Sequence, residues 1–98
     1  MWLFVVRGAS QPGTADEFAR KWHDVYSVRF PEMPEFERAY FSADHETNTW
    51  LAVAVWNARP DETQLRQAIQ ELGAQIGSFM AGPPSAEWLE VLQQINSR

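Results

Sequence analysis

The sequence predicts an α+β fold in which the elements follow the order β-α-β-β-α-β. Three observations lead to this order. A short apolar run opens the chain, two segments carry apolar residues at helical spacing, and two runs rich in aromatic and β-branched residues lie between those segments. No linker, repeat or low-complexity tract interrupts the 98 residues, so we expect a single domain over residues 1–98.

The first strand is expected from Trp2 to Arg7, because this run is apolar on both faces and a glycine-containing turn follows it. The first helix is expected from about Thr14 to Val28. Thr14 and Glu17 have the spacing of a capping box, in which each side chain bonds the other residue's backbone N–H. Pro31 favours an end to this helix, because proline cannot donate to the helical hydrogen-bond ladder.

Two further strands, Phe36 to Ala43 and Thr49 to Trp56, are expected to form an antiparallel hairpin around the polar connection from Asp44 to Asn48. The second helix follows Asp61, which has capping spacing to Gln64. Its apolar stripe is Leu65, Ile69, Leu72, Ile76 and Phe79.

The last segment, Ala86 to Ile95, fits either a strand or a short helix. We favour a strand, because the first strand needs a partner. The whole then predicts a ferredoxin-like subunit with two helices on one face of a four-stranded antiparallel sheet. The other face is expected to be apolar too, through Leu51, Val53 and Val55. An apolar outer face predicts a homodimer with its sheets packed face to face, a dimeric α+β barrel.

Composition excludes several classes of function. The chain carries 13 Asp and Glu against 8 Lys and Arg, with no basic run, so we expect neither a nucleic-acid nor a membrane partner. Zero cysteines remove disulfides, thiol catalysis and cysteine-based metal sites, and a cytoplasmic location is expected by default. His23 and His45 stand outside any metal-ligand spacing and are expected at the surface, so no metal and no other cofactor is predicted.

These features together resemble the antibiotic-biosynthesis-monooxygenase-like family of dimeric α+β barrel proteins. The resemblance is carried by the opening strand, by a helix with Glu17, Phe18 and Trp22, and by the run from Leu51 to Trp56 before a second helix. It implies a cofactor-independent monooxygenase that acts on a flat aromatic or quinone-like molecule bound between helices and sheet. The alternative is a non-catalytic barrel with a structural or ligand-binding role, since some members have no established reaction.

Other members of the family degrade haem, and the resemblance implies three residues for that activity. They are an Asn on the first strand, a Trp at the end of the third strand and a His about ten residues further on. Trp56 matches the Trp, but Arg66 stands at the His position and the first strand has no Asn. Haem degradation by that set is therefore not expected, because an axial ligand is missing.

The candidate ligand site rests on residue size along one strand face. Ala52 and Ala54 stand between Trp50 and Trp56, which leaves volume for a ligand or for a closely packed helix carrying Gly73 and Gly77. The candidate ligand-binding residues are Trp22, Tyr26, Trp50 and Trp56. For Trp56 the alternative is that it only closes the core.

The candidate catalytic residues depend on the hairpin register. If Ser42 pairs with Trp50, Arg38 and Tyr40 lie across from the two alanines and face the gap. Arg38 would then stabilise a substrate anion, and Tyr40 or Tyr26 would donate a hydrogen bond. A slip of one residue would instead bring Ala39 and Phe41 to this face. For Arg38 the alternative is that it pairs with Glu37 or Glu35 or lies exposed.

Overall fold

The computed structural model describes residues 1–97, with the side chain of Leu72 outside the described part. The elements in chain order are β1 (Trp2–Ala9), α1 (Ala15–Arg29), η1 (Phe30–Glu32), β2 (Phe36–Asp44), β3 (Thr49–Trp56), α2 (Glu62–Ile76), η2 (Gly77–Phe79) and β4 (Ser85–Glu90). η1 and η2 are single 3-10 turns that follow the two helices directly. The predicted β-α-β-β-α-β order is confirmed.

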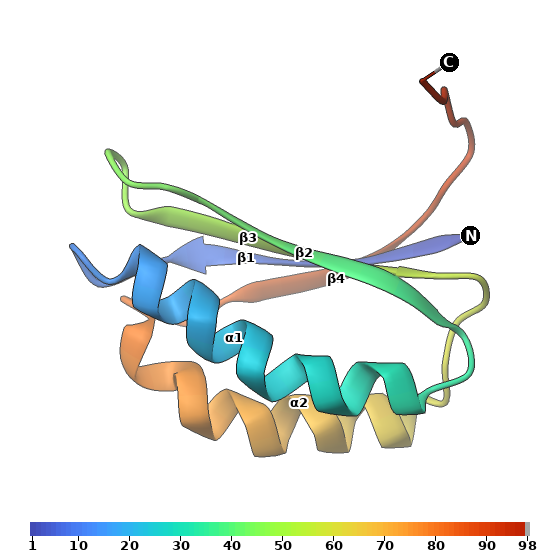
Figure 1. Cartoon of the computed structure of the whole chain (residues 1–98), viewed down its shortest axis with the longest axis horizontal. Coiled ribbons are helices and arrows are strands. Elements are labelled where there is room, and N and C mark those ends of the chain that lie inside the picture. Colours follow the sequence, from blue (N-terminus) through green and yellow to red (C-terminus); the bar gives the residue numbers. More distant parts are fainter. Residues whose placement is uncertain (98) are drawn as a thin grey trace.

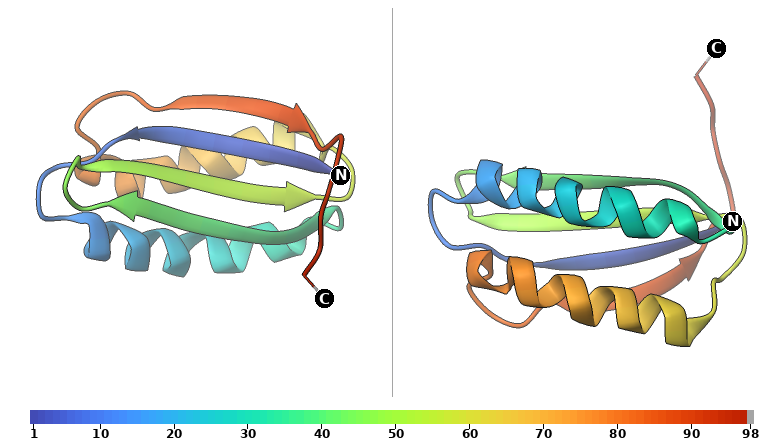
Figure 2. Two further views of the ribbon diagram at one scale, coloured as in Figure 1. Left: turned by 90° about the horizontal axis from the view of Figure 1, so that it is seen from above. Right: turned by 60° about the horizontal axis from the view of Figure 1, so that its bottom comes forward.

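The four strands form one sheet in the order β2-β3-β1-β4, and every neighbouring pair is antiparallel. Both helices cover the same face of this sheet (Figure 1). Figure 2 shows α1 beside β2 and β3, and α2 beside β1 and β4. This arrangement confirms the predicted ferredoxin-like subunit. Within residues 1–97, no helix has the length and apolar character needed to cross a membrane.

The two helices begin differently. Asp61 caps α2 as predicted, because its carboxylate accepts a hydrogen bond from the Gln64 backbone N–H at 3.0 Å. The capping box predicted for Thr14 is wrong. Its hydroxyl instead donates to the Gln11 carbonyl at 2.6 Å, which closes the turn before α1 rather than capping the helix. Pro31 lies in η1, where the chain continues for one 3-10 turn past the end of α1.

The last segment is a strand, as favoured, but it ends at Glu90. Residues 91–97 follow without regular secondary structure and project away from the outer face of the sheet (Figure 1). Two of their apolar side chains have almost no cover, since Leu92 is 79% exposed and Ile95 is 98% exposed.

The hairpin register differs from the predicted one by one residue. Ala43 pairs with Trp50 and Ser42 pairs with Leu51, so the predicted pairing of Ser42 with Trp50 is wrong. Asp44, expected in the connection, instead pairs with Thr49, so the connection is one residue shorter than expected. The Asp44 carboxylate accepts hydrogen bonds from the backbone N–H groups of Glu46 and Thr47 and holds this tighter turn.

Two aromatic clusters fill the ends of the space between helices and sheet. At one end Phe18 is fully buried against Trp50, Phe41 and Phe79, with ring centroids 4.8–5.5 Å apart. At the other end Trp56 is fully buried against Phe30 and Phe36, at 5.6 and 5.3 Å. Ring pairs at these separations contribute packing energy beyond the area they bury.

We expect Phe18→Ala to lower the free energy of unfolding by about 3–5 kcal/mol, because the truncation removes a buried ring and leaves a cavity between three other rings. Urea unfolding followed by far-UV circular dichroism measures the change. Val28→Ala on the same helix is the control. Val28 is 63% exposed, so its loss should change the free energy by no more than about 0.5 kcal/mol. Equal effects of the two substitutions would contradict this account of the core.

Candidate functional site

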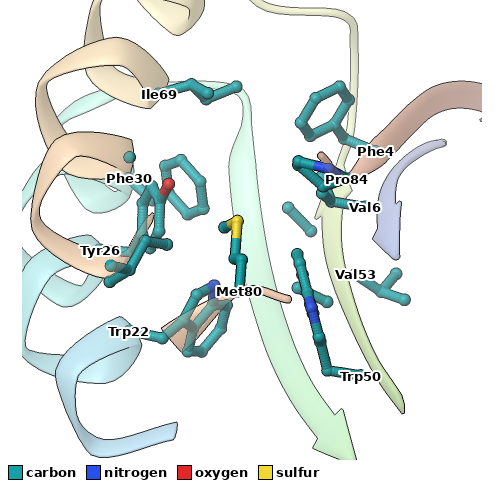
Figure 3. Close-up of a pocket in the computed structure, with 14 residues that line it drawn as sticks. Phe4, Val6, Trp22, Tyr26, Phe30, Trp50, Val53, Ile69, Met80 and Pro84 are labelled. Atoms are coloured by element: carbon teal, nitrogen blue, oxygen red, sulfur yellow. The ribbon is translucent and has the colours of Figure 1, made fainter. Parts of the chain in front are cut away.

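A cavity of about 280 Å³ lies between the two aromatic clusters, bordered by both helices and the inner face of the sheet and partly open to solvent. Figure 3 shows the side chains around it. Its lining comes from β1, α1, η1, β3, α2 and the connection before β4. The lining residues are Phe4, Val6, Trp22, Tyr26, Phe30, Trp50, Ala52, Val53, Ala54, Ile69, Gly73, Ile76, Met80 and Pro84. None of these side chains is ionised at neutral pH, so the site is suited to an apolar guest.

Small residues on opposite sides keep this space open. Ala52 and Ala54 form the floor on β3, as the size pattern predicted. Gly73 lies in the facing part of α2, and a methyl group built there would meet no atom within 4 Å. The alternative of close helix packing at Gly73 and Gly77 is therefore wrong, because neither glycine has a neighbour at that distance.

Aromatic side chains form the walls. Trp50 is held in place because its indole Nε1 donates to the Ala9 carbonyl at 3.2 Å. Trp22 and Tyr26 both point from α1 toward the sheet, and their rings are 5.8 Å apart (Figure 3). The sequence predicted all three as ligand-binding residues, and the structure brings them together around one cavity.

Tyr26 has the only hydroxyl group among the residues that line the cavity. The side chain is 8% exposed, and this burial raises the pKa of the Tyr26 phenol from 10.0 to about 12. The hydroxyl is therefore neutral throughout the physiological range. It can donate a hydrogen bond to a ligand carbonyl but cannot act as a resting base.

Trp56 does not line the cavity. Trp56 is fully buried behind the lining residue Phe30 and also contacts Phe36 and Trp88. Its Nε1 is buried with no hydrogen-bond partner among residues 1–97. The packing alternative thus describes the position of Trp56 better than the ligand-binding role.

Arg38 and Tyr40 do not face the alanine floor, because the true register places Ala39 and Phe41 across from Ala54 and Ala52. Tyr40 is 57% exposed on the outer face. Arg38 lies 3.9 Å from the Glu37 carboxylate, in keeping with the alternative of a glutamate neighbour.

Arg38 nevertheless lies near the cavity, on the far side of the aromatic residues that line it. Arg38 and His23 line a separate hollow of about 220 Å³ between α1 and β2. The row formed by Trp22, Tyr26 and Phe30 lines both this hollow and the cavity, so these three rings form the wall between them. Arg38 therefore stands on the outer side of that wall.

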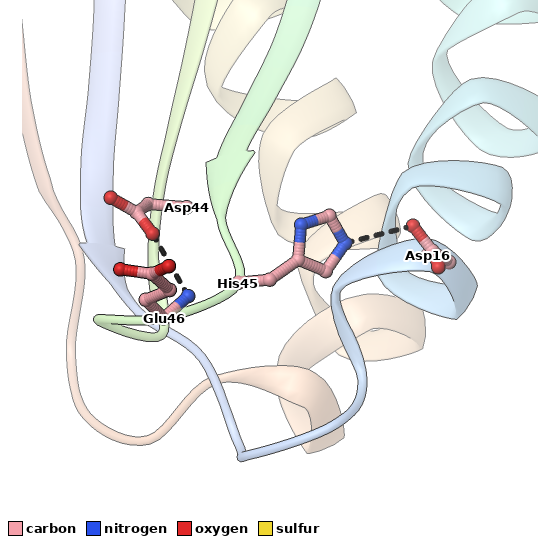
Figure 4. A network of polar contacts seen from close by, with 4 residues as sticks. All are labelled: Asp16, Asp44, His45 and Glu46. Carbon is pink, nitrogen blue, oxygen red and sulfur yellow. Dashed lines mark hydrogen bonds and ion pairs between the residues drawn. The ribbon is translucent and has the colours of Figure 1, made fainter.

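The two histidines lie at the surface, as expected. His23 has a side chain 73% exposed and His45 one 69% exposed. Figure 4 shows His45 at the tip of the hairpin, where its Nε2 lies 3.1 Å from an Asp16 carboxylate oxygen at the start of α1. An exposed pair of this kind contributes little stability. Among residues 1–97, no three His, Asp or Glu side chains gather as a metal site would require.

Several lining residues escaped the sequence analysis. Ile69 and Ile76 were assigned only to the helical stripe, and Phe4 only to an apolar strand. Gly73 carried the clearest signal, since a glycine in a helix interior costs about 1 kcal/mol relative to alanine and calls for a reason. Met80 and Pro84 gave none, because they lie in the connection before β4, whose path depends on the fold.

Comparison with solved structures finds the same architecture in known oxygenases. A monooxygenase from the gene ActVA-Orf6 of Streptomyces coelicolor, in complex with nanaomycin D, superposes with a TM-score of 0.77 at 20% identity, over 99% of this chain and 92% of the other. A mutant form of SnoaB, a cofactor-independent oxygenase from Streptomyces nogalater, gives 0.72 at 19% identity, over 98% of this chain and 97% of the other. The chain shares their fold.

The predicted resemblance is thus confirmed in the architecture, and identities this low speak to the fold alone. A conserved protein from Methanosarcina mazei Go1, whose name states no reaction, also matches with a TM-score of 0.66 at 14% identity, over 91% of each chain. No family model matches the sequence, and the search of curated proteins finds no match. These matches therefore assign no activity to this chain.

Tyr26 should give the protein a distinct alkaline response. The native phenol keeps its proton up to about pH 12, while the unfolded phenol loses it near 10.0. The native state therefore binds more protons in this interval, and stability falls as pH rises through it. We expect wild type to lose about 2 kcal/mol more than Tyr26→Phe between these two pH values. Urea unfolding at a series of pH values measures this, and parallel losses would contradict the burial of the phenol.

Proposed function

We propose that this protein binds a flat, apolar small molecule in the cavity between its helices and sheet and oxidises it with O₂. The observation that carries the proposal is the 280 Å³ apolar cavity held open by Ala52, Ala54 and Gly73. Two neighbours of the same fold add support, since one is named a cofactor-independent oxygenase and the other was solved with nanaomycin D.

The chemistry asks little of the protein if the substrate supplies its own electrons. In the oxidation of an anthrone to an anthraquinone, the methylene carbon loses two hydrogens and gains one oxygen atom from O₂. The second oxygen atom leaves as water with those two hydrogens, so no separate reductant is needed. The reactive species is the anthrone enolate, and a site that stabilises its oxygen lowers the barrier.

Tyr26 is the residue to which we assign this stabilisation. Tyr26 lines the cavity, and in this proposal its neutral hydroxyl donates to the substrate carbonyl, where negative charge develops on deprotonation. The cavity lining offers no ionised base, so the substrate proton passes to water in this proposal. Arg38 and Tyr40 receive no role at the reacting atoms, because neither lines the cavity.

The second candidate is a binding protein without catalysis. It is favoured by the same lining, which offers hydrophobic contact and aromatic stacking but a single hydroxyl. Ligand binding without oxygen consumption would distinguish this candidate from the oxygenase.

Gly73→Leu should lower oxygen uptake with an anthrone or quinol substrate by about tenfold or more. Its side chain would enter the cavity, and overpacking a bound ligand costs about 1–3 kcal/mol. The variant should fold, because a Cβ at Gly73 meets no atom within 4 Å and leucine is the better helix former. An oxygen electrode measures the rate, and calorimetry measures substrate binding.

Gly77→Leu is the matched control, since it places the same side chain one turn later and outside the cavity. Wild-type uptake by Gly77→Leu together with loss in Gly73→Leu would support the site. Equal rates in both variants would place the reaction elsewhere, and binding without uptake in wild type would leave the non-catalytic candidate.

We further infer that the protein is a homodimer through the outer face of the sheet. Leu3, Val53 and Leu51 are partly buried there, and no helix or strand of residues 1–97 covers this face (Figure 1). Figure 3 shows Val53 directed away from the cavity, toward this face. The exposed Leu92 and Ile95 of the projecting segment supply further apolar surface for a second copy.

Val53→Asp should convert the dimer to a monomer at micromolar concentration, because an aspartate at the centre of the interface would be buried without a partner. Sedimentation velocity distinguishes the 11.3 kDa chain from a species of twice that mass. Val28→Asp, the same substitution on the exposed side of α1, should leave the assembly unchanged. A wild-type protein that sediments as a monomer would refute the dimer.

A further inference from the structure

A third hollow, of about 210 Å³, lies between α2 and the edge strand β4. Phe4 and Ile69 line both this hollow and the apolar cavity, so the two spaces adjoin across these side chains. Arg66 also lines the hollow and lies three residues before Ile69, on the same side of the helix. The cationic Arg66 thus lies outside the uncharged cavity, beyond the boundary that Phe4 and Ile69 form.

The charge of Arg66 is not neutralised by an ion pair within residues 1–97, since the pairs found there do not include it. Glu62 is the only carboxylate that lines the hollow, and Arg59 already binds it at 3.3 Å. Arg59 is held in turn by stacking on Trp88, with its guanidinium carbon 4.9 Å from the ring centroid. With Glu62 paired to Arg59, the Arg66 guanidinium is the charged group of this lining that has no ion pair within residues 1–97.

We propose that Arg66 is a specificity-determining residue that selects ligands with an acidic group attached to a flat apolar body. The body occupies the cavity, and a carboxylate or ionised phenol at its end passes Phe4 and Ile69 to meet the guanidinium. The inference rests on the proposed ligand site and adds the chemical class of the ligand. It requires no covalent step.

This placement agrees with the energetics of charge burial. A guanidinium inside the cavity would lose its hydration without a permanent partner, whereas Arg66 is exposed and remains solvated when no ligand is bound. The chain as a whole has a net charge of -5 and repels anions. An anionic ligand therefore needs a local cation, and a guanidinium binds a carboxylate through two parallel hydrogen bonds.

The test compares naphthalene-2-carboxylate with naphthalene-2-carboxamide, two probes of nearly equal shape that differ in charge. Isothermal titration calorimetry on the full chain should show tighter binding of the carboxylate. Arg66→Gln should weaken carboxylate binding by about threefold to tenfold and leave the carboxamide unchanged. Arg66→Lys should retain part of the preference. Gly73→Leu should weaken both probes, because they share the cavity.

Two control variants each remove one positive charge, as Arg66→Gln does. Arg20→Gln removes an exposed arginine of α1 that lines none of the three hollows, and Arg38→Gln removes the arginine of the α1/β2 hollow. Neither should change the carboxylate preference. Equal effects of Arg66→Gln on both probes, or transfer of the preference to Arg38, would overturn the inference while leaving the cavity as the binding site. Failure of wild type to bind either probe would refute the proposed site and the inference together.

Discussion

The alternation of large and small side chains along the inner face of β3 is the constraint on which the site depends. Trp50 and Trp56 stand at the two ends of this face, and each is buried in an aromatic cluster that includes residues of α1 or η1. These clusters act as spacers between helices and sheet. Because Ala52 and Ala54 lie between them, the helices are held too far from the sheet for the middle of the layer to close.

The same arrangement explains why the cavity persists although voids destabilise a folded protein. Closing it would require the helices to approach the alanines, which would force the rings at both ends out of their packing. Gly73 adds to the space from the facing helix, at a cost to helix propensity. Ala52, Ala54 and Gly73 thus each lower the stability of the fold around the same cavity. A ligand explains this pattern more easily than packing does.

The fold was predictable because the spacing of apolar residues and the positions of Gly, Pro and polar turn residues indicate the same elements along the chain. The strand face that contains Trp50 was assigned correctly from side-chain size. The pairing register of β2 with β3 was not predictable, because a change of one residue in the length of their connection shifts it. Asp44 pairs with Thr49 and also closes the turn with its carboxylate, so the connection is one residue shorter than a count of polar residues suggests. Because successive side chains of a strand point to opposite faces, this shift of one residue places Ala39 and Phe41 across from the two alanines in place of Arg38 and Tyr40.

The corrected register changes the chemistry that the site can perform. With Arg38 and Tyr40 outside, the one hydroxyl among the lining residues is the Tyr26 phenol, and its burial keeps that phenol protonated. Such a site can stabilise charge that develops on a ligand oxygen but cannot generate that charge by itself. The substrate must therefore be acidic enough to ionise with only a hydrogen bond in support, which restricts the proposed reaction to activated molecules such as anthrones and quinols.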